Sequence, residues 1–260
     1  MLFGVLAGAA VALVMNLLLL GLVEAAGAEL QTRDVGDAFE KAGEVAAYAG
    51  ERLRAAATGE ELPEPPTIQA DQTAIALGLA TTLALNVVLV GVVAAVTRQR
   101  TGELASRLGL RGFDPLALWR PMLAVLGCYA MVVGYAAIVD ALDIGVLQPE
   151  STVPFEVVRE PLTIVLTGVA VVAVAPLAEE VFYRGLLFGG LQRWGFWPAA
   201  LISGVVFSGV HLDLGSLIPF FIIGVVLAWL FWRRGNLWES VAFHVIFNAV
   251  SFSLLLATEA

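Results

Sequence analysis

The chain of 260 residues is 59% hydrophobic, has a mean hydropathy of +0.87 and carries a formal net charge of −9. Charged residues make up 14% of the sequence, far below the ~25% of soluble domains, which predicts a polytopic membrane protein. The acidic balance argues against nucleic acid as a partner. The single cysteine, Cys128, excludes an internal disulfide and a zinc cluster built on cysteines.

The apolar segments predict an all-α transmembrane bundle of about seven helices, because ~20 apolar residues cross a bilayer. The expected spans are approximately residues 2–23, 73–97, 118–139, 160–178, 198–212, 215–232 and 237–257. The first span lacks the basic n-region of a signal peptide, and its apolar run is longer than that of a signal peptide. We therefore interpret it as a retained helix, with cleavage after Ala25-Ala26-Gly27-Ala28 as the alternative. The fourth is expected to continue as a helix to about Gln192. A tight turn around Asp213-Leu214-Gly215 is expected to join the fifth and sixth.

Residues 24–72 form a sizeable extramembrane segment between the first two spans. Apolar side chains recur at helical spacing from Val35 to Leu53 with charged side chains between them, which predicts an amphipathic helix. A proline-rich linker follows at residues 62–66. We therefore expect three regions, which are 1–72 (first transmembrane helix, amphipathic helix and linker), 73–150 (two transmembrane helices with a basic loop) and 151–260 (a four-helix catalytic membrane core).

Arginine placement predicts the topology. With a cytoplasmic N-terminus, nine arginines in three segments fall on the cytoplasmic side, and the acidic segments 24–72 and 144–160 fall outside, in agreement with the positive-inside rule. These arginines are Arg98, Arg100, Arg107, Arg111, Arg120, Arg184, Arg193, Arg233 and Arg234. We expect an integral protein of the plasma membrane.

Two adjacent glutamates follow the uncharged run from Leu162 to Leu177. A carboxylate at membrane depth costs roughly 2.5–3.5 kcal/mol on insertion scales, so two in succession indicate a function. Glu180 and Arg184 are four residues apart, which places them on one helical face as an ion pair. Glu179 has no such partner and suits a general base. A purely structural pair that locks helices together is the alternative for Glu180 and Arg184.

The chain has two histidines, His211 and His244, and both lie in later apolar segments. His244 and Asn248 are four residues apart, so both project from one face of an otherwise apolar helix and need partners inside the bundle. Taken singly, His211 also fits a structural place at a helix end, and His244 fits an interhelical hydrogen bond. The fifth span has a face of small residues that favours close helix packing, namely Ser203, Gly204, Ser208 and Gly209.

Together these side chains supply a base, a water-orienting imidazole and two oxyanion donors, the minimum set for hydrolysing a peptide bond with activated water. The motifs Glu179-Glu180-x-x-x-Arg184, Phe207-x-x-x-His211 and His244-x-x-x-Asn248, in this order, resemble those of the CAAX-processing and bacteriocin-processing intramembrane proteases (the CPBP or Abi family). This family includes the type II CAAX prenyl endopeptidase. The resemblance covers roughly residues 160–255.

The resemblance implies a role for each position. Glu179 would be the general base that, with His211, holds and activates the attacking water. His244 and Asn248 would form the oxyanion hole. Glu180 and Arg184 would support the site, with a direct part for Glu180 in the chemistry as the alternative, and Phe207 would pack beside His211.

Metal dependence stays open at this point. Glu179, His211 and His244 would make a zinc set of two histidines and one glutamate with an open position. The alternative is a metal-free glutamate mechanism. Asn248 favours this alternative, because a metal-bound His244 could not also donate to an oxyanion.

The sequence therefore predicts an intramembrane endopeptidase whose site opens to water on the cytoplasmic side. Its substrate would be a membrane-associated protein or peptide, for which prenylation is not assumed. A proton-coupled transporter is one alternative, because buried glutamate and histidine also form proton relays, although the inverted repeats of such carriers are not evident. A non-catalytic immunity or scaffold protein of the membrane is the other.

Overall fold

The structure is a computed structural model that describes residues 48–63, 72–149 and 160–259, apart from residues 49, 53, 56, 111 and 212. All regular elements within these ranges are helical. Five helical segments there are long and apolar enough to cross a membrane, namely Ile75–Thr97, Pro115–Ala141, Pro161–Trp194, Leu217–Arg234 and Leu237–Ala257. The predicted all-α membrane bundle is confirmed. The span predicted at 2–23 and most of the predicted amphipathic helix lie outside the described residues.

The helices follow the predicted spans closely. In chain order they are α3 (Gln72–Thr97), α4 (Thr101–Arg107), α5 (Trp119–Ala141), α6 (Pro161–Gly168), α7 (Ala175–Glu180), α8 (Gly189–Leu191), α9 (Phe196–Gly209), α10 (Leu217–Arg234) and α11 (Leu237–Glu259). Short 3-10 turns are η1 (Pro115–Leu118), η2 (Gly145–Leu147) and η6 (Gln192–Trp194), and π-helical turns are η4 (Val169–Val174) and η5 (Val181–Phe188). Helical residues also occur between Tyr48 and Thr58.

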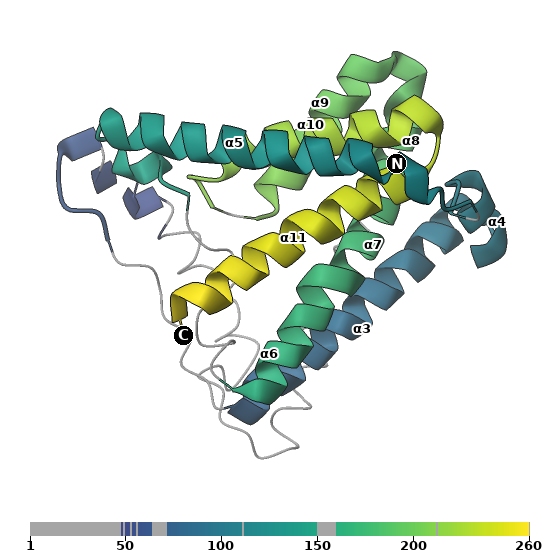
Figure 1. Cartoon of the computed structure of the whole chain (residues 1–260), viewed down its shortest axis with the longest axis horizontal. Helices are drawn as coiled ribbons and strands as arrows, with labels where there is room; N and C mark the ends of the chain where they lie inside the picture. Colours follow the sequence, from purple (N-terminus) through teal and green to yellow (C-terminus); the bar gives the residue numbers. More distant parts are fainter. Residues whose placement is uncertain are drawn as a thin grey trace.

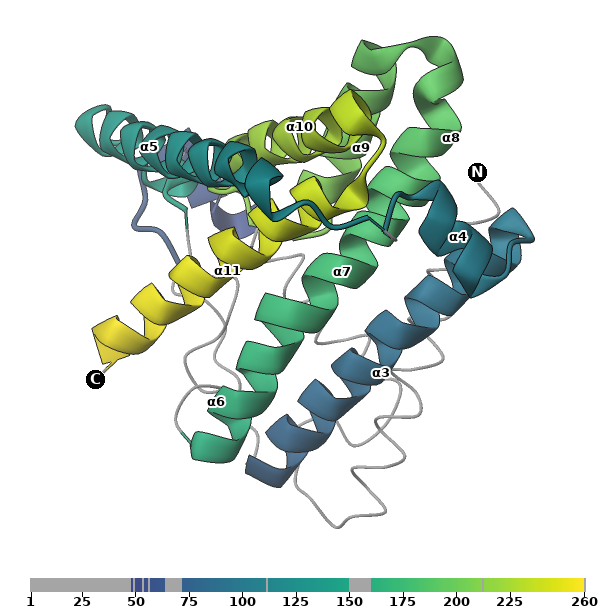
Figure 2. The same cartoon turned by 45° about the vertical axis from the view of Figure 1, so that its right-hand side comes forward.

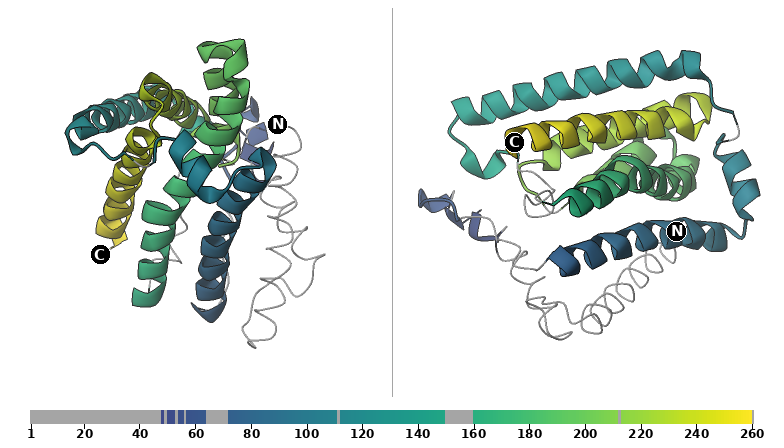
Figure 3. Two further views of the ribbon diagram at one scale, coloured as in Figure 1. Left: turned by 90° about the vertical axis from the view of Figure 1, so that its right-hand side faces the viewer. Right: turned by 60° about the horizontal axis from the view of Figure 1, so that its bottom comes forward.

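Four long elements lie side by side in the order α5, α11, the continuous helix built from α6 to α8, and α3 (Figure 3). The α9–α10 hairpin packs across α5, α11 and η5 (Figures 1 and 2). The largest apolar core among the described residues lies where these elements meet, around Phe188, Leu227 and Phe243, each with a fully buried side chain. This arrangement brings the last turn of α7, the end of α9 and the middle of α11 together.

The helix from Pro161 to Trp194 is continuous, as predicted, but it is not α-helical throughout. Pro176 has no N–H to donate to the preceding turn and its ring crowds that turn, which accounts for the π-helical η4 just before it. A second π-helical turn, η5, begins directly after Glu180. The short α7 that carries both glutamates is therefore bounded on each side by a π-helical turn, a feature that often occurs at functional sites.

The α9–α10 hairpin depends on glycine at its crossing. A Cβ added to Gly224 of α10 would lie 2.9 Å from Cα of Gly204 in α9, so the two backbones approach each other directly. Ser203, Gly204 and Ser208 are buried in this contact, as the predicted small-residue face requires, whereas Gly209 is exposed. The prediction that this span reaches residue 212 was wrong, because α9 ends at Gly209 and a turn follows.

Candidate active site

Glu180 and Arg184 form the predicted ion pair, with 3.1 Å between Oε1 and Nη1 and both side chains fully buried. A buried pair is stable only where further contacts satisfy its remaining groups. Arg184 also donates through Nη2 to the carbonyl of Gly224 at 3.3 Å and lies 4.7 Å from the centre of the Phe207 ring. Oε1 of Glu180 additionally faces Nδ1 of His244 at 3.0 Å. The pair thus joins η5 to α10, α9 and α11.

His244 lies between the two adjacent carboxylates. Its Nδ1 is 3.0 Å from Glu180, and its Nε2 is 3.9 Å from Oε2 of Glu179. Because Glu180 is paired with Arg184 and accepts hydrogen bonds, Nδ1 is the protonated nitrogen. Nε2 then carries a proton only when the ring is an imidazolium. A charged His244 can therefore donate to an oxyanion, whereas a neutral His244 presents a lone pair at Nε2.

Glu179 differs from its neighbour in access to solvent. Its side chain is 27% exposed, while that of Glu180 is fully buried. Side chains of adjacent helical residues point about 100° apart, so Glu180 points into the bundle while Glu179 points out of it. Of the two, Glu179 is the carboxylate that is accessible from outside the helix bundle.

His211 lies in the turn after α9 and is half-buried. Its Nδ1 is 2.8 Å from the carbonyl oxygen of Phe207, and its ring lies 4.5 Å from that of Phe220, centre to centre. A carbonyl only accepts hydrogen bonds, so Nδ1 carries the proton and Nε2 of the neutral ring is an acceptor. Nε2 of neutral His211 can therefore accept a hydrogen bond from a bound water molecule.

The Phe207 ring joins the three motifs. It is almost fully buried, and its centre lies 5.1 Å from that of the His211 ring and 5.8 Å from that of His244. Tyr183 packs on it edge-to-face at 5.3 Å, and the Arg184 guanidinium covers it. The contact with His211 is the one that the resemblance implied.

Asn248 lies one turn after His244 and donates through Nδ2 to the carbonyl of Val171 at 2.7 Å. Val171 belongs to η4, where π-helical pairing leaves a carbonyl available to a partner outside the helix. Asn248 thus fixes the π-helical turn that precedes the glutamates. Its amide has a second N–H, which leaves one donor for a ligand.

A zinc ion does not fit these side chains as they stand. Within the described residues, no three histidine, cysteine, aspartate or glutamate side chains are grouped so that they could hold a metal ion. Nδ1 of His211 and Nδ1 of His244 contact protein oxygens, so only Nε2 of each ring would be available to bind a metal ion. We derive no step through a metal.

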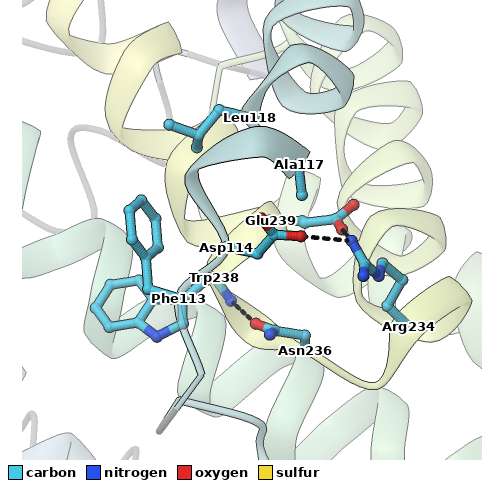
Figure 4. Close-up of a pocket in the computed structure, with 8 residues that line it drawn as sticks. All are labelled: Phe113, Asp114, Ala117, Leu118, Arg234, Asn236, Trp238 and Glu239. Carbon is cyan, nitrogen blue, oxygen red and sulfur yellow. Dashed lines mark hydrogen bonds and ion pairs between the residues drawn. The ribbon is translucent and has the colours of Figure 1, made fainter.

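A small pocket lies away from these residues, where η1 and α10 meet the start of α11 (Figure 4). Phe113, Asp114, Arg234 and Glu239 line it, together with Ala117, Leu118, Asn236 and Trp238. Arg234 contacts Asp114 at 3.5 Å and Glu239 at 3.3 Å, and Arg120 also contacts Glu239 at 3.3 Å. None of the predicted site residues lines this pocket, and its charged lining residues form ion pairs between helix ends.

Residues of all three motifs thus meet around Phe207 and Glu180. Residues 161–250 match the family model of the Type II CAAX prenyl endopeptidase Rce1-like proteins. The matched segment runs from the start of α6 to the middle of α11 and contains all three motifs. The resemblance inferred from the motifs is confirmed.

Two relatives illustrate the extent of the similarity. A stretch of 89 residues is 34% identical to "Putative membrane peptidase YdiL" of Bacillus subtilis (strain 168) and covers 34% of this chain and 35% of that protein. A stretch of 76 residues is 33% identical to the UPF0177 protein YxdF of Lactococcus lactis subsp. lactis (strain IL1403), covering 29% of this chain and 42% of that protein. The chain thus aligns with less than half the length of these relatives. No solved structure matches it.

These matches support a membrane protease in general, and the apolar helices indicate an integral membrane protein. Several contacts of the site were not predicted from the sequence. The carbonyl of Gly224, the ring of Phe220 and the carbonyl of Val171 all hold site residues, but each lies in an apolar stretch without a local signal. Pro176 was the available signal for the π-helical turn η4.

Proposed function

We propose that the protein is an intramembrane endopeptidase that hydrolyses a peptide bond of a membrane-associated protein or peptide with a water molecule activated by Glu179. The observation that carries the proposal is the position of His244 between Glu179 and Glu180, at 3.9 Å and 3.0 Å. This arrangement holds one carboxylate rigidly and leaves the other partly exposed beside the His244 imidazole. The family match over residues 161–250 supports the same chemistry.

In the proposed reaction, Glu179 takes a proton from water, and the water oxygen attacks the carbonyl carbon of the scissile bond. Nε2 of neutral His211 accepts a hydrogen bond from the same water and orients it. The oxyanion accepts hydrogen bonds from Nε2 of protonated His244 and from Asn248. Glu179 then returns the proton to the leaving nitrogen, and the C–N bond breaks to give a carboxylic acid and an amine.

In this proposal, Glu180 and Arg184 are positioning residues. The carboxylate of Glu180 orients the His244 ring through Nδ1, while Arg184 fixes Glu180 against α10 and Phe207. The enzyme would lie in the plasma membrane with its N-terminus in the cytoplasm, and residues 151–260 would form its catalytic core. Prenylation of the substrate is not assumed.

The test compares membranes that contain wild type, Glu179→Gln or His211→Ala by quantitative proteomics of newly formed protein termini. Glu179→Gln keeps the shape of the side chain and removes the base, so the rate of cleavage should fall by roughly 10²–10⁴-fold. His211→Ala should also reduce cleavage. Glu160→Gln is the matched control, because Glu160 is exposed at the start of the same long helix.

Termini that form with wild type and with Glu160→Gln, but not with Glu179→Gln, would support the proposal and identify substrates. Identical termini from all four proteins, each present in the membrane at equal amounts, would contradict it. Proton-coupled uptake that disappears with Glu179→Gln would instead favour the transporter alternative.

A further inference from the structure

The turn that carries His211 is held from outside the membrane core. Asp213, two residues after His211, accepts hydrogen bonds from the backbone N–H groups of Gly215 at 3.1 Å and Ser216 at 3.0 Å. An aspartate that caps two successive N–H groups fixes the backbone of such a turn. Its side chain is only about 10% exposed, so its charge needs a partner.

Arg52 supplies that partner from the extramembrane segment. Its Nη1 lies 3.7 Å from Oδ1 of Asp213, and its side chain is 4% exposed. Nη2 donates to the carbonyl of Gly145 at 3.2 Å, and the guanidinium lies 5.7 Å from the centre of the Tyr48 ring. Figure 1 draws the segment with Arg52 in purple beside the end of α5. Arg52 therefore ties the segment both to η2 and to the α9–α10 turn.

The α9–α10 turn also packs directly against the residue that follows η2. A Cβ added to Gly215 would overlap with the carbonyl oxygen of Gln148, so this contact admits only glycine. Three segments that are distant in sequence thus meet at one point, next to a residue of the candidate site. The family match begins at residue 161, so Arg52 lies outside it.

We propose that Arg52 is a positioning residue for catalysis, which holds the His211 turn in its reactive geometry through the ion pair with Asp213. This inference rests on the proposed function, since it assigns a task to His211. Without Arg52, the buried charge of Asp213 loses a partner, and the turn between Gly209 and Leu217 becomes less restrained. A small displacement of a group that orients the attacking water lowers turnover strongly.

The test uses Arg52→Met in the full-length protein in membranes. An internally quenched peptide, built on a cleavage site found in the comparison of termini, gives kcat and KM. We expect kcat to fall by roughly 10–100-fold with little change in KM, because the displaced group orients water rather than substrate. Arg52→Lys keeps the charge opposite Asp213 and should recover part of this loss.

Arg54→Met is the matched control. Arg54 lies two residues further along, pairs with Glu60 at 3.3 Å, and has a side chain that is 66% exposed. Its replacement should leave kcat within about twofold of wild type, as is usual for exposed positions. Equal kcat for Arg52→Met and Arg54→Met would overturn the proposal. A rise in KM at unchanged kcat would also overturn it, since Arg52 would then act on substrate binding.

Hydrogen exchange separates this proposal from the protease assignment. The peptide that contains the N–H groups of Gly215 and Ser216 should exchange faster in Arg52→Met than in wild type or Arg54→Met. If wild type shows no cleavage that depends on Glu179, the proposed function fails, and this exchange alone decides whether Arg52 restrains the turn. An unchanged exchange rate in Arg52→Met would show that Arg52 does not restrain the turn, and it would overturn the inference.

Discussion

At the scale of single residues, the two adjacent glutamates illustrate how one helix gives two carboxylates different tasks. Glu180 is fully buried and is shared between Arg184 and His244, whereas Glu179 is partly exposed. The desolvation of Glu180 is offset only while Arg184 remains beside it. The position of Glu180 therefore depends on Arg184, one turn later. The position of Glu179 in turn depends on the packing that this ion pair holds in place.

Arg184→Met tests this dependence. The replacement leaves the buried carboxylate of Glu180 without its cation, and we expect a loss of about 3–5 kcal/mol in the free energy of unfolding. Reversible unfolding in detergent micelles measures this change. Replacing both Glu180 and Arg184 by Leu should recover much of the loss, because an apolar pair has no desolvation cost.

The control for this stability measurement is Arg193→Met in the same continuous helix. Arg193 is exposed and stacks on Trp194, with 5.0 Å from the guanidinium to the ring centre. Its replacement should change stability by less than about 0.5 kcal/mol. A loss for Arg184→Met no larger than that for Arg193→Met would show that the buried pair does not stabilise the bundle.

At the scale of elements, the site depends on how closely α9 and α10 approach each other. Gly224 permits this approach because a side chain there would meet Gly204 and Phe207, and its carbonyl accepts from Arg184. Gly224 provides both the backbone contact with α9 and the carbonyl that accepts from Arg184. The distance between α9 and α10 therefore sets the position of the Arg184 guanidinium. Phe207, on the facing side of α9, is placed by the same contact.

Gly224→Ala should therefore separate the two helices. The added Cβ would lie 2.9 Å from Cα of Gly204, and neither backbone can yield without moving the helix. We expect a loss of about 1–3 kcal/mol from overpacking, together with lower cleavage activity, as measured by unfolding and by the termini assay. Gly91→Ala in α3 is the control, because Gly91 is exposed and its added Cβ would meet nothing within 4 Å. Equal stability of the two variants would contradict the role of the crossing.

The elements also show what the sequence could predict. Apolar run length placed α3, α5, α10 and α11 within a few residues, because that length must match the bilayer. It misplaced the end of α9, since Val210 and His211 extend an apolar pattern into a turn that Asp213 caps. The motifs predicted polar residues that the structure brings into contact, such as Glu180 with His244, and their roles stay a prediction. The distances between them could not be predicted, because they depend on the π-helical turns and on the contact between Gly204 and Gly224, which arise from packing.

At the scale of the whole molecule, two groups of loops lie at different ends of the bundle. One group joins Arg52, Gly145 and the Asp213 turn. The other joins the segment 108–120 to the α10–α11 turn, where Trp238 donates to Leu110 and Asn236 donates to Gly112. In Figure 1, α4 and the start of α11 gather toward the right, whereas the purple segment lies at the left. The second group contains predicted cytoplasmic arginines, and the first contains acidic segments predicted outside.

Cysteine labelling tests this sidedness. The native Cys128 is 4% exposed, so wild type provides a blank for a membrane-impermeant maleimide. Glu61→Cys and Ser106→Cys place a thiol at exposed positions close in sequence to the first and second groups, respectively. If the arginine-rich loops are cytoplasmic, Glu61→Cys should be labelled in intact cells and Ser106→Cys only after permeabilisation. The reverse pattern would invert the topology and place the Arg52 ion pair on the cytoplasmic side. Labelling of both in intact cells would mean that the two groups do not lie on opposite sides of the membrane.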